Sequence, residues 1–118
     1  KIDQNHIKVY SKNKIFNGLL EKIKDTANKY NQQVSYNLNV GLIEFPLQDY
    51  ESVLTLFQEI CQNNETKKID INVNVKNGFM IIEFIFKPKK EMEYEVNNRY
   101  ILKEKIADYE SIKYVLKL

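Results

Sequence analysis

The fold of this chain is set by residues 53–86, which read VLTLFQEICQNNETKKIDINVNVKNGFMIIEFIF. The first part of this stretch carries apolar residues at the spacing i, i+1, i+4, i+7 and i+8, which places them on one side of a helix. They are Val53, Leu54, Phe57, Ile60 and Cys61. Asp49 is a candidate N-cap, because its side chain can accept hydrogen bonds from the free N–H groups of a helix start. A helix over residues 50–63 is therefore predicted.

A β-hairpin follows this helix. Residues 69–76 alternate apolar and polar side chains, the period-2 pattern of a strand with one buried face, and residues 79–86 are apolar except for Glu83. Asn77-Gly78 separates the two runs. A type I′ turn needs positive φ at both central residues, which Asn and Gly adopt readily. We therefore predict strands over residues 69–75 and 79–86.

A helix and a strand are predicted upstream of this stretch. Apolar residues recur at helical spacing over residues 12–30. They are Ile15, Phe16, Leu19, Leu20, Ile23, Ala27 and Tyr30. Residues 34–40 alternate apolar and polar side chains, which predicts a strand, and Pro46 interrupts regular structure before the next helix.

The C-terminal segment is interpreted as a final hairpin that follows a charged connector over residues 87–98. Its apolar residues are Tyr100, Leu102 and Ile106 in one arm and Ile112, Tyr114, Leu116 and Leu118 in the other. A turn over residues 107–110 would join the arms, and a helix over residues 100–108 is the alternative. We expect Tyr36, Tyr100 and Tyr114 to face the core, where large aromatic side chains pack.

These elements predict the fold class. Two helices with one apolar side each need a sheet to cover. The expected fold is α+β: a two-layer α/β sandwich, in which a mixed, mostly antiparallel sheet of about five strands is covered on one face by two helices. A chain of 118 residues with 43% hydrophobic side chains supplies one core. We expect residues 1–11 to be the end of an upstream segment or a linker, and residues 12–118 to form a single domain.

Composition excludes several classes of function. The net charge of +2 is too small to indicate a nucleic-acid partner, and no apolar run approaches the roughly 20 residues of a membrane span. A cytoplasmic location is therefore expected. The single cysteine excludes an internal disulfide, and Cys61 is interpreted as a small core residue. His6 is the only histidine, so ligand spacing for a metal is lacking.

The run Leu56-Phe57-Gln58-Glu59-Ile60-Cys61-Gln62-Asn63-Asn64, followed by Lys67-Lys68-Ile69-Asp70-Ile71 and an apolar return strand, resembles the ATP-binding domain of sensor histidine kinases of the GHKL superfamily. In that family a helix of the type Gln-Glu-x-x-x-Asn supplies a Mg²⁺-binding Asn, which would fall on Asn63. Residues 13–36 are similar to the first helix and strand of the quorum-sensing and citrate-sensor branches.

Two features that the family uses for nucleotide binding are missing after the hairpin. The family ends its return strand with Asp-x-Gly, whose carboxylate binds the adenine amino group, whereas this chain has Phe86-Lys87-Pro88. The family also needs a glycine-rich lid, because backbone without Cβ approaches phosphates closely. Residues 87–98 contain no glycine, and Gly18, Gly41 and Gly78 all lie upstream. The C-terminal domain of the sporulation phosphotransferase B type of protein has the same plan without a nucleotide site.

Glu59 and Asn63 are the candidate cofactor-binding residues, and only if a nucleotide binds. They lie one turn apart, so they share the helix face that would look into a nucleotide cavity. The interpretation that we favour is that both are solvent-exposed on the outer side of the helix. The charged residues of the connector are interpreted as a solvated loop rather than a phosphate site. They are Lys87, Lys89, Lys90, Glu91, Glu93 and Glu95. No catalytic residue and no metal ligand is predicted.

The resemblance and its departures imply a nucleotide-free, histidine-kinase-like module of a bacterial two-component or phosphorelay signalling protein. Such a module would act by protein–protein interaction and would not be an enzyme. The expected partner is a protein, for example a response regulator, with a homodimer forming through upstream helices. One alternative is a divergent but active kinase domain that binds ATP and Mg²⁺, with another residue in place of the missing Asp. The other is an unrelated small α/β binding domain.

Overall fold

A computed structural model describes residues 14–40, 45–96 and 99–118. Its elements are two helices and five strands, in the order α1 (Lys14–Lys29), β1 (Gln33–Asn39), α2 (Gln48–Gln62), β2 (Lys68–Lys76), β3 (Phe79–Phe86), β4 (Tyr100–Ile106) and β5 (Tyr109–Lys117). The alternation patterns of the sequence therefore correspond to the strands, and the 3.6-residue patterns correspond to the helices.

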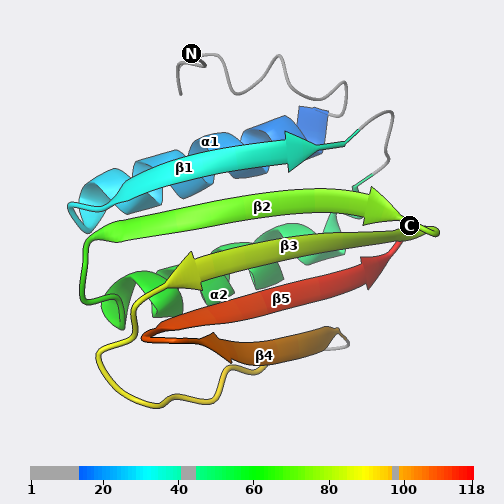
Figure 1. Cartoon of the computed structure of the whole chain (residues 1–118). Coiled ribbons are helices and arrows are strands. Elements are labelled where there is room, and N and C mark those ends of the chain that lie inside the picture. Colours follow the sequence, from blue (N-terminus) through cyan, green and yellow to red (C-terminus); the bar gives the residue numbers. More distant parts are fainter. Residues whose placement is uncertain (1–13, 41–44, 97–98) are drawn as a thin grey trace.

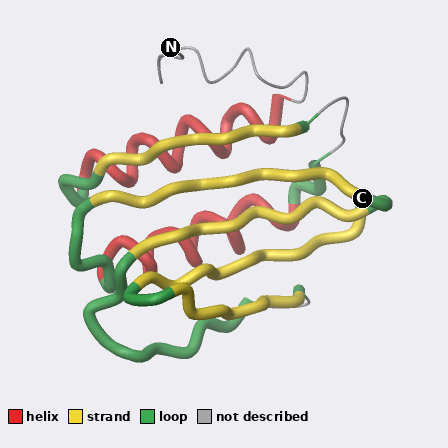
Figure 2. Tube along the Cα trace, in the orientation of Figure 1, coloured by secondary structure: helices red, strands yellow, loops and turns green. Residues whose placement is uncertain are grey.

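The five strands form one mixed sheet in the order β1-β2-β3-β5-β4 (Figures 1 and 2). β1 and β2 are parallel, and α2 provides the long crossover that a parallel pair requires. The other neighbouring strands are antiparallel. Asn77 and Gly78 have φ of 53° and 80°, which are the positive values of the expected type I′ turn between β2 and β3.

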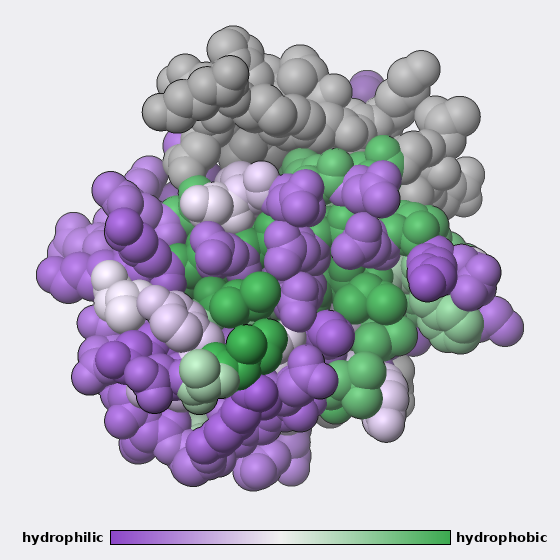
Figure 3. Space-filling model, in the orientation of Figure 1, coloured by the Kyte–Doolittle hydropathy of each residue, from purple (hydrophilic) through white to green (hydrophobic). Residues whose placement is uncertain are grey.

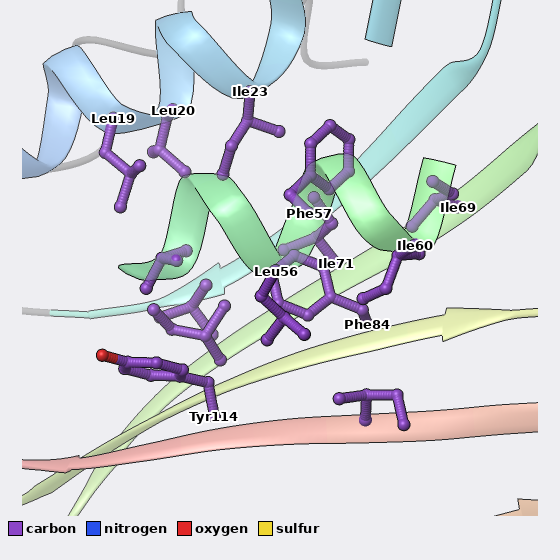
Figure 4. Packing of buried hydrophobic residues seen from close by; sticks show 14 of the residues in the cluster. Leu19, Leu20, Ile23, Leu56, Phe57, Ile60, Ile69, Ile71, Phe84 and Tyr114 are labelled. Carbon is purple, nitrogen blue, oxygen red and sulfur yellow. The ribbon is translucent and has the colours of Figure 1, made fainter. Parts of the chain in front are cut away.

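Both helices cover the same face of the sheet (Figure 1), and the core lies between these two layers (Figure 4). Side chains of α1 and α2 meet inward residues of β2, β3 and β5. The Phe57 and Phe84 ring centroids lie 5.9 Å apart, a tilted aromatic contact across the layers. The expected fold class is thereby confirmed, including the placement of the two helices on one face.

Most element boundaries agree with the sequence-based prediction to within one or two residues. Residues 12 and 13 of the expected first helix lie outside the described residues, as do residues 1–11, which include His6. The C-terminal hairpin is confirmed and the helix alternative over residues 100–108 is wrong. The turn is shorter than expected, because Tyr109 and Glu110 already belong to β5.

The predicted N-cap is wrong. Helix α2 begins at Gln48 after Leu47, and no side chain caps it with a hydrogen bond. Asp49 lies inside the first turn and is 1% exposed, with its carboxylate bound by Tyr114 of β5 and by Arg99, which directly precedes β4. The Arg99 guanidinium and the Tyr114 hydroxyl stabilise this carboxylate more strongly than the backbone N–H groups of the helix start, which water can also reach, would do.

The predicted orientation of β4 is also wrong. Ile106 pairs with Tyr109 across the two-residue turn, so the even-numbered residues of β4 lie on the face opposite to Ile112, Tyr114 and Leu116. Tyr100 is 63% exposed, and Leu102 and Ile106 are exposed as well. Tyr114 is fully buried as expected, and Tyr36 is half-buried with its hydroxyl donating to the Leu20 carbonyl at 3.1 Å.

The second face of the sheet has no helix over it among the described elements, and Figure 3 views the molecule from this side. Outward residues of β1 and β2 are polar or charged, whereas β3, β5 and β4 present apolar side chains between charged ones. We call this surface the open face. None of the described helices is long and apolar enough to cross a membrane.

Candidate functional site

The candidate site lies at the C-terminal end of α2, where Asn63 is the C-cap residue. The Asn63 side chain is buried, with 2% of the residue exposed. Its Nδ2 donates to the Lys90 carbonyl and to the Tyr94 hydroxyl, both at 3.0 Å, and its Oδ1 accepts from the Lys90 N–H at 3.2 Å. Both donor hydrogens and one acceptor position of the amide are therefore used within the chain.

These bonds hold the connector, residues 87–96, against α2. Lys89 N–H adds a backbone bond to the Asn63 carbonyl at 2.8 Å. Tyr94 is 7% exposed, and its ring meets that of Phe86 edge-on, with centroids 6.5 Å apart. Burial raises the pKa of the Tyr94 hydroxyl, with the Asn63 bond acting in the opposite direction. A tyrosine ring of the connector thus fills the space beside the helix end and the end of β3.

A second anchor holds the chain after the connector at the other end of α2. Arg99 Nε donates to Asp49 Oδ1 at 2.5 Å, and a second guanidinium nitrogen donates to Oδ2 at 2.7 Å. The Tyr114 hydroxyl donates to Oδ1 as well. Burial acts to raise the pKa of Asp49, but the bonds from Arg99 and Tyr114 outweigh it, so the pKa lies below its usual value. The start of β4 is therefore tied to α2 by a bidentate ion pair.

Glu110 is a buried carboxylate of a different kind. It is fully buried at the start of β5, where it is the ladder partner of Phe86, and no described residue donates a hydrogen bond to either carboxylate oxygen. Lys103 Nζ lies 3.7 Å from Oε2 and also donates to Glu91 and to the Met92 carbonyl. Burial raises the pKa of Glu110, and Lys103 compensates for this only in part.

Glu59 and Asn63 lie one turn apart at the C-terminal end of α2, where the Asn63 amide donates to the Tyr94 hydroxyl. Glu59 is half-buried. The expectation that both residues are solvent-exposed is wrong for Asn63, because the connector covers its amide. Lys89 and Lys90 are exposed, as expected for a solvated loop, and Lys87 is half-buried.

The end of β3 does not provide the groups of a nucleotide site. The Lys87 carbonyl accepts from the Glu65 N–H at 2.8 Å, and Asn64 bridges to Pro88. The segment thus continues as paired backbone instead of offering an acidic side chain. Without glycine, the connector also lacks the close backbone approach that a phosphate cradle needs. In the part of the chain that the structure describes, no group of three or more His, Cys, Asp or Glu residues could hold a metal ion.

Sequence reasoning missed a polar network next to this site. Asn64 Nδ2 donates to Gln32 Oε1 at 2.7 Å and to the Lys68 carbonyl at 3.0 Å, and Gln32 Nε2 donates to the Cys61 carbonyl at 2.8 Å. Two consecutive asparagines after an apolar helix were the signal, because amides often satisfy the free carbonyls of a helix end. Cys61 is buried as expected, and burial raises the pKa of its thiol to about 12.

Comparison with solved structures places this arrangement in a known fold. The structure is similar to that of the Acinetobacter baumannii histidine kinase AdeS, with a TM-score of 0.66 and 8% identity, over 87% of this chain and 62% of that chain. A nucleotide-free form of the catalytic domain of histidine kinase ThkA matches with the same TM-score and identity, over 87% of this chain and 90% of that chain. This chain thus spans less than two thirds of the AdeS structure.

No protein-family profile and no curated protein sequence matches the chain. At 8% identity the likeness concerns the fold. The chain therefore has a fold similar to the catalytic domains of GHKL histidine kinases, as the resemblance of residues 56–71 implied.

Proposed function

We propose that this histidine-kinase-like domain works without a nucleotide, as a protein-binding module of a two-component or phosphorelay signalling protein. The bonds that the connector makes to Asn63 carry this proposal. Asn63 is the residue that the family would use to hold Mg²⁺ through its side-chain oxygen. Here that oxygen accepts the Lys90 N–H, and both amide hydrogens are donated to the connector. ATP and Mg²⁺ would have to displace the connector before reaching the amide.

The remaining groups support the same proposal. An adenine site that lacks its hydrogen-bonding carboxylate leaves the base's amino group unpaired, which costs several kcal/mol. The end of β3 provides no carboxylate, and the connector provides no glycine. The protein would then be no enzyme. Its binding partner would be a response regulator or a related signalling protein in the cytoplasm, and upstream helices would pair two copies.

One observation favours the divergent but active kinase domain as a second candidate. Glu110 lies directly across the ladder from Phe86, so it is a buried carboxylate next to the place where the family has its Asp. Its oxygens have no hydrogen-bond partner. An exocyclic amino group could use them if the connector moved away. Under this second candidate, Glu110 replaces the missing adenine-binding residue.

Calorimetric titration with ATP and with GTP, each with Mg²⁺, separates the two candidates. We expect no saturable, adenine-selective heat at micromolar concentration, while an active histidine kinase catalytic domain serves as the positive control. Selective ATP binding that is lost in both Asn63→Ala and Glu110→Gln would refute the proposal and support the active domain. Circular dichroism of both variants verifies that they remain folded.

A further inference from the structure

Two short stretches far apart in the sequence form one basic surface at the C-terminal end of α2. Residues 63–68 and 87–90 are joined by the Glu65–Lys87 and Lys89–Asn63 backbone bonds, both 2.8 Å, and by the bridge between Asn64 and Pro88. Together they carry five lysines, which we call the lysine patch: Lys67, Lys68, Lys87, Lys89 and Lys90. Four of these are exposed, and the Lys87 side chain is 38% exposed.

The lysine patch concentrates the charge of the molecule. Glu65 is the single acidic residue of the two stretches, and its carboxylate lies 3.4 Å from Lys87 Nζ. Five lysines and one glutamate give a formal charge of +4, whereas the whole chain carries +2, so all other residues together carry −2. Such an asymmetric distribution steers an anionic partner toward one end of the protein.

The ladder between β2 and β3 ends at the Asp70–Ile85 pair, and beyond it the Lys87 carbonyl accepts from the Glu65 N–H at 2.8 Å. The segment that carries Lys87, Lys89 and Lys90 therefore runs beside the loop that leads to Lys67 and Lys68. Gathering like charges in one place costs free energy in the isolated domain, and an anionic group bound over them would offset this cost.

Exposed apolar side chains adjoin the lysines on the open face. The β3–β5 ladder ends with Phe86 opposite Glu110, Lys87 directly follows this pair in the chain and Tyr109 directly precedes it, and Ile106 pairs with Tyr109 in β4. Tyr109 is 45% exposed and Ile106 is 48% exposed. In Figure 3 the end of the molecule where β2 begins and β3 ends is mostly hydrophilic, with hydrophobic side chains next to it. This end of the open face thus presents lysine side chains and the apolar side chains of Tyr109 and Ile106 to a binding partner.

We propose that the lysine patch, with Tyr109 and Ile106, docks an acidic segment of a partner protein that also presents an apolar side chain. This inference rests on the proposed function, because it names the surface through which the domain would bind. Acidic side chains would pair with the lysines, while the apolar side chain would cover Tyr109 and Ile106. A nucleic acid would use the charge, but its phosphates gain nothing from the aliphatic surface of Ile106. Binding to an anionic membrane, which could use both the charge and the apolar side chains, is the outcome that the vesicles below test.

The probe is a synthetic peptide of alternating Glu and Leu, titrated into the 118-residue chain and followed by fluorescence anisotropy. Three further probes test the chemistry: an all-Glu peptide of the same length, single-stranded DNA, and vesicles of phosphatidylglycerol and phosphatidylcholine. We expect the Glu/Leu peptide to bind best, and its affinity to fall at high salt. Replacing Lys68, Lys89 and Lys90 by Glu should weaken its binding about tenfold or more.

A matched variant changes the same number of charges elsewhere. Lys14, Lys22 and Lys117 are exposed, and replacing them by Glu should leave the peptide affinity within about twofold. Tyr109→Ser should reduce the preference for Glu/Leu over all-Glu. Equal effects of the two triple variants, or stronger binding of DNA or vesicles than of the Glu/Leu peptide, would overturn the inference. Titration of the same samples with ATP tests the proposed nucleotide-free function independently of the peptide. A failure of that function can therefore be distinguished from a failure of the docking inference.

Discussion

Two buried carboxylates, Asp49 and Glu110, illustrate how neighbouring residues determine the sign of an electrostatic contribution. Asp49 is bound by a guanidinium and a phenol, so its pKa is lowered and its charged form stabilises the fold. Burial raises the pKa of Glu110, whose oxygens have no hydrogen-bond partner among the described residues, and Lys103 at 3.7 Å compensates for this only in part. The same functional group thus stabilises the domain at one site and opposes its folding at the other.

Opposite pH dependences are expected for the two amide variants. Because the folded pKa of Glu110 is raised, its contribution to stability is lost as the pH rises through its titration range, and Glu110→Gln should be more stable than the native chain at neutral pH. Asp49→Asn should be less stable at neutral pH, because the lowered pKa makes the ionised form stabilising. Both differences should shrink as the pH falls toward about 3, where carboxyls protonate. Denaturant unfolding at several pH values measures this, and parallel pH profiles of the two variants would contradict it.

At Phe57 the expected effect is a loss of core packing. Phe57 is fully buried and packs against Phe84, and Ile82 on the sheet is 1% exposed. Phe57→Ala should cost about 3–5 kcal/mol, a large part of the stability of a small domain. Tyr100→Ala is the control, since Tyr100 is 63% exposed and should lose less than about 1 kcal/mol. Chemical denaturation compares the two, and a loss below about 1 kcal/mol for Phe57→Ala would contradict the expected packing.

At the scale of elements, the connector and the start of β4 are fixed to opposite ends of α2. Asn63 holds the connector near the C-terminus of α2, and Asp49 holds Arg99 near the N-terminus of the same helix. Tyr94, which lies between these two points in the sequence, is 7% exposed. The helix α2 thus serves both as part of the layer that covers the core and as the attachment site of the connector.

The two described glycines should respond to alanine in opposite directions. Gly78 has φ of +80° in the β2–β3 turn, so Gly78→Ala should cost about 1 kcal/mol or more. Gly18 lies in α1, and no atom of the described residues lies within 4 Å of an added Cβ, so Gly18→Ala should stabilise the helix by about 0.5–1 kcal/mol. Thermal unfolding followed by circular dichroism detects both shifts. A gain in stability for Gly78→Ala would show that the turn is not of the expected type.

At the scale of the whole molecule, two layers enclose one core and leave the other face of the sheet without a helix among the described elements. The lysine patch lies at the end of the molecule where α2 and β3 terminate, so positive charge is concentrated at that end. Binding at that end would leave the core undisturbed. The triple lysine variants change exposed side chains and no residue of the core.

The sequence alone determined the elements, their order and the buried side of each element except β4. Periods of 2 and 3.6 residues are local properties, and Asn77-Gly78 fixes a turn through φ preferences of two adjacent residues. The absence of Asp-x-Gly and of glycine in the connector was likewise readable from single positions. These features need no knowledge of long-range contacts.

Only the tertiary structure decided where the polar groups lie. Asn63 bonds to residues 27 and 31 positions away, and Asp49 bonds to Arg99, which is 50 positions away. The outward orientation of Tyr100 depends on a hairpin register that changes face with a single residue of turn length. The partners of the buried Asn63 and Asp49 side chains come from chain segments that pass over them, and the path of those segments follows from the packing of the whole core.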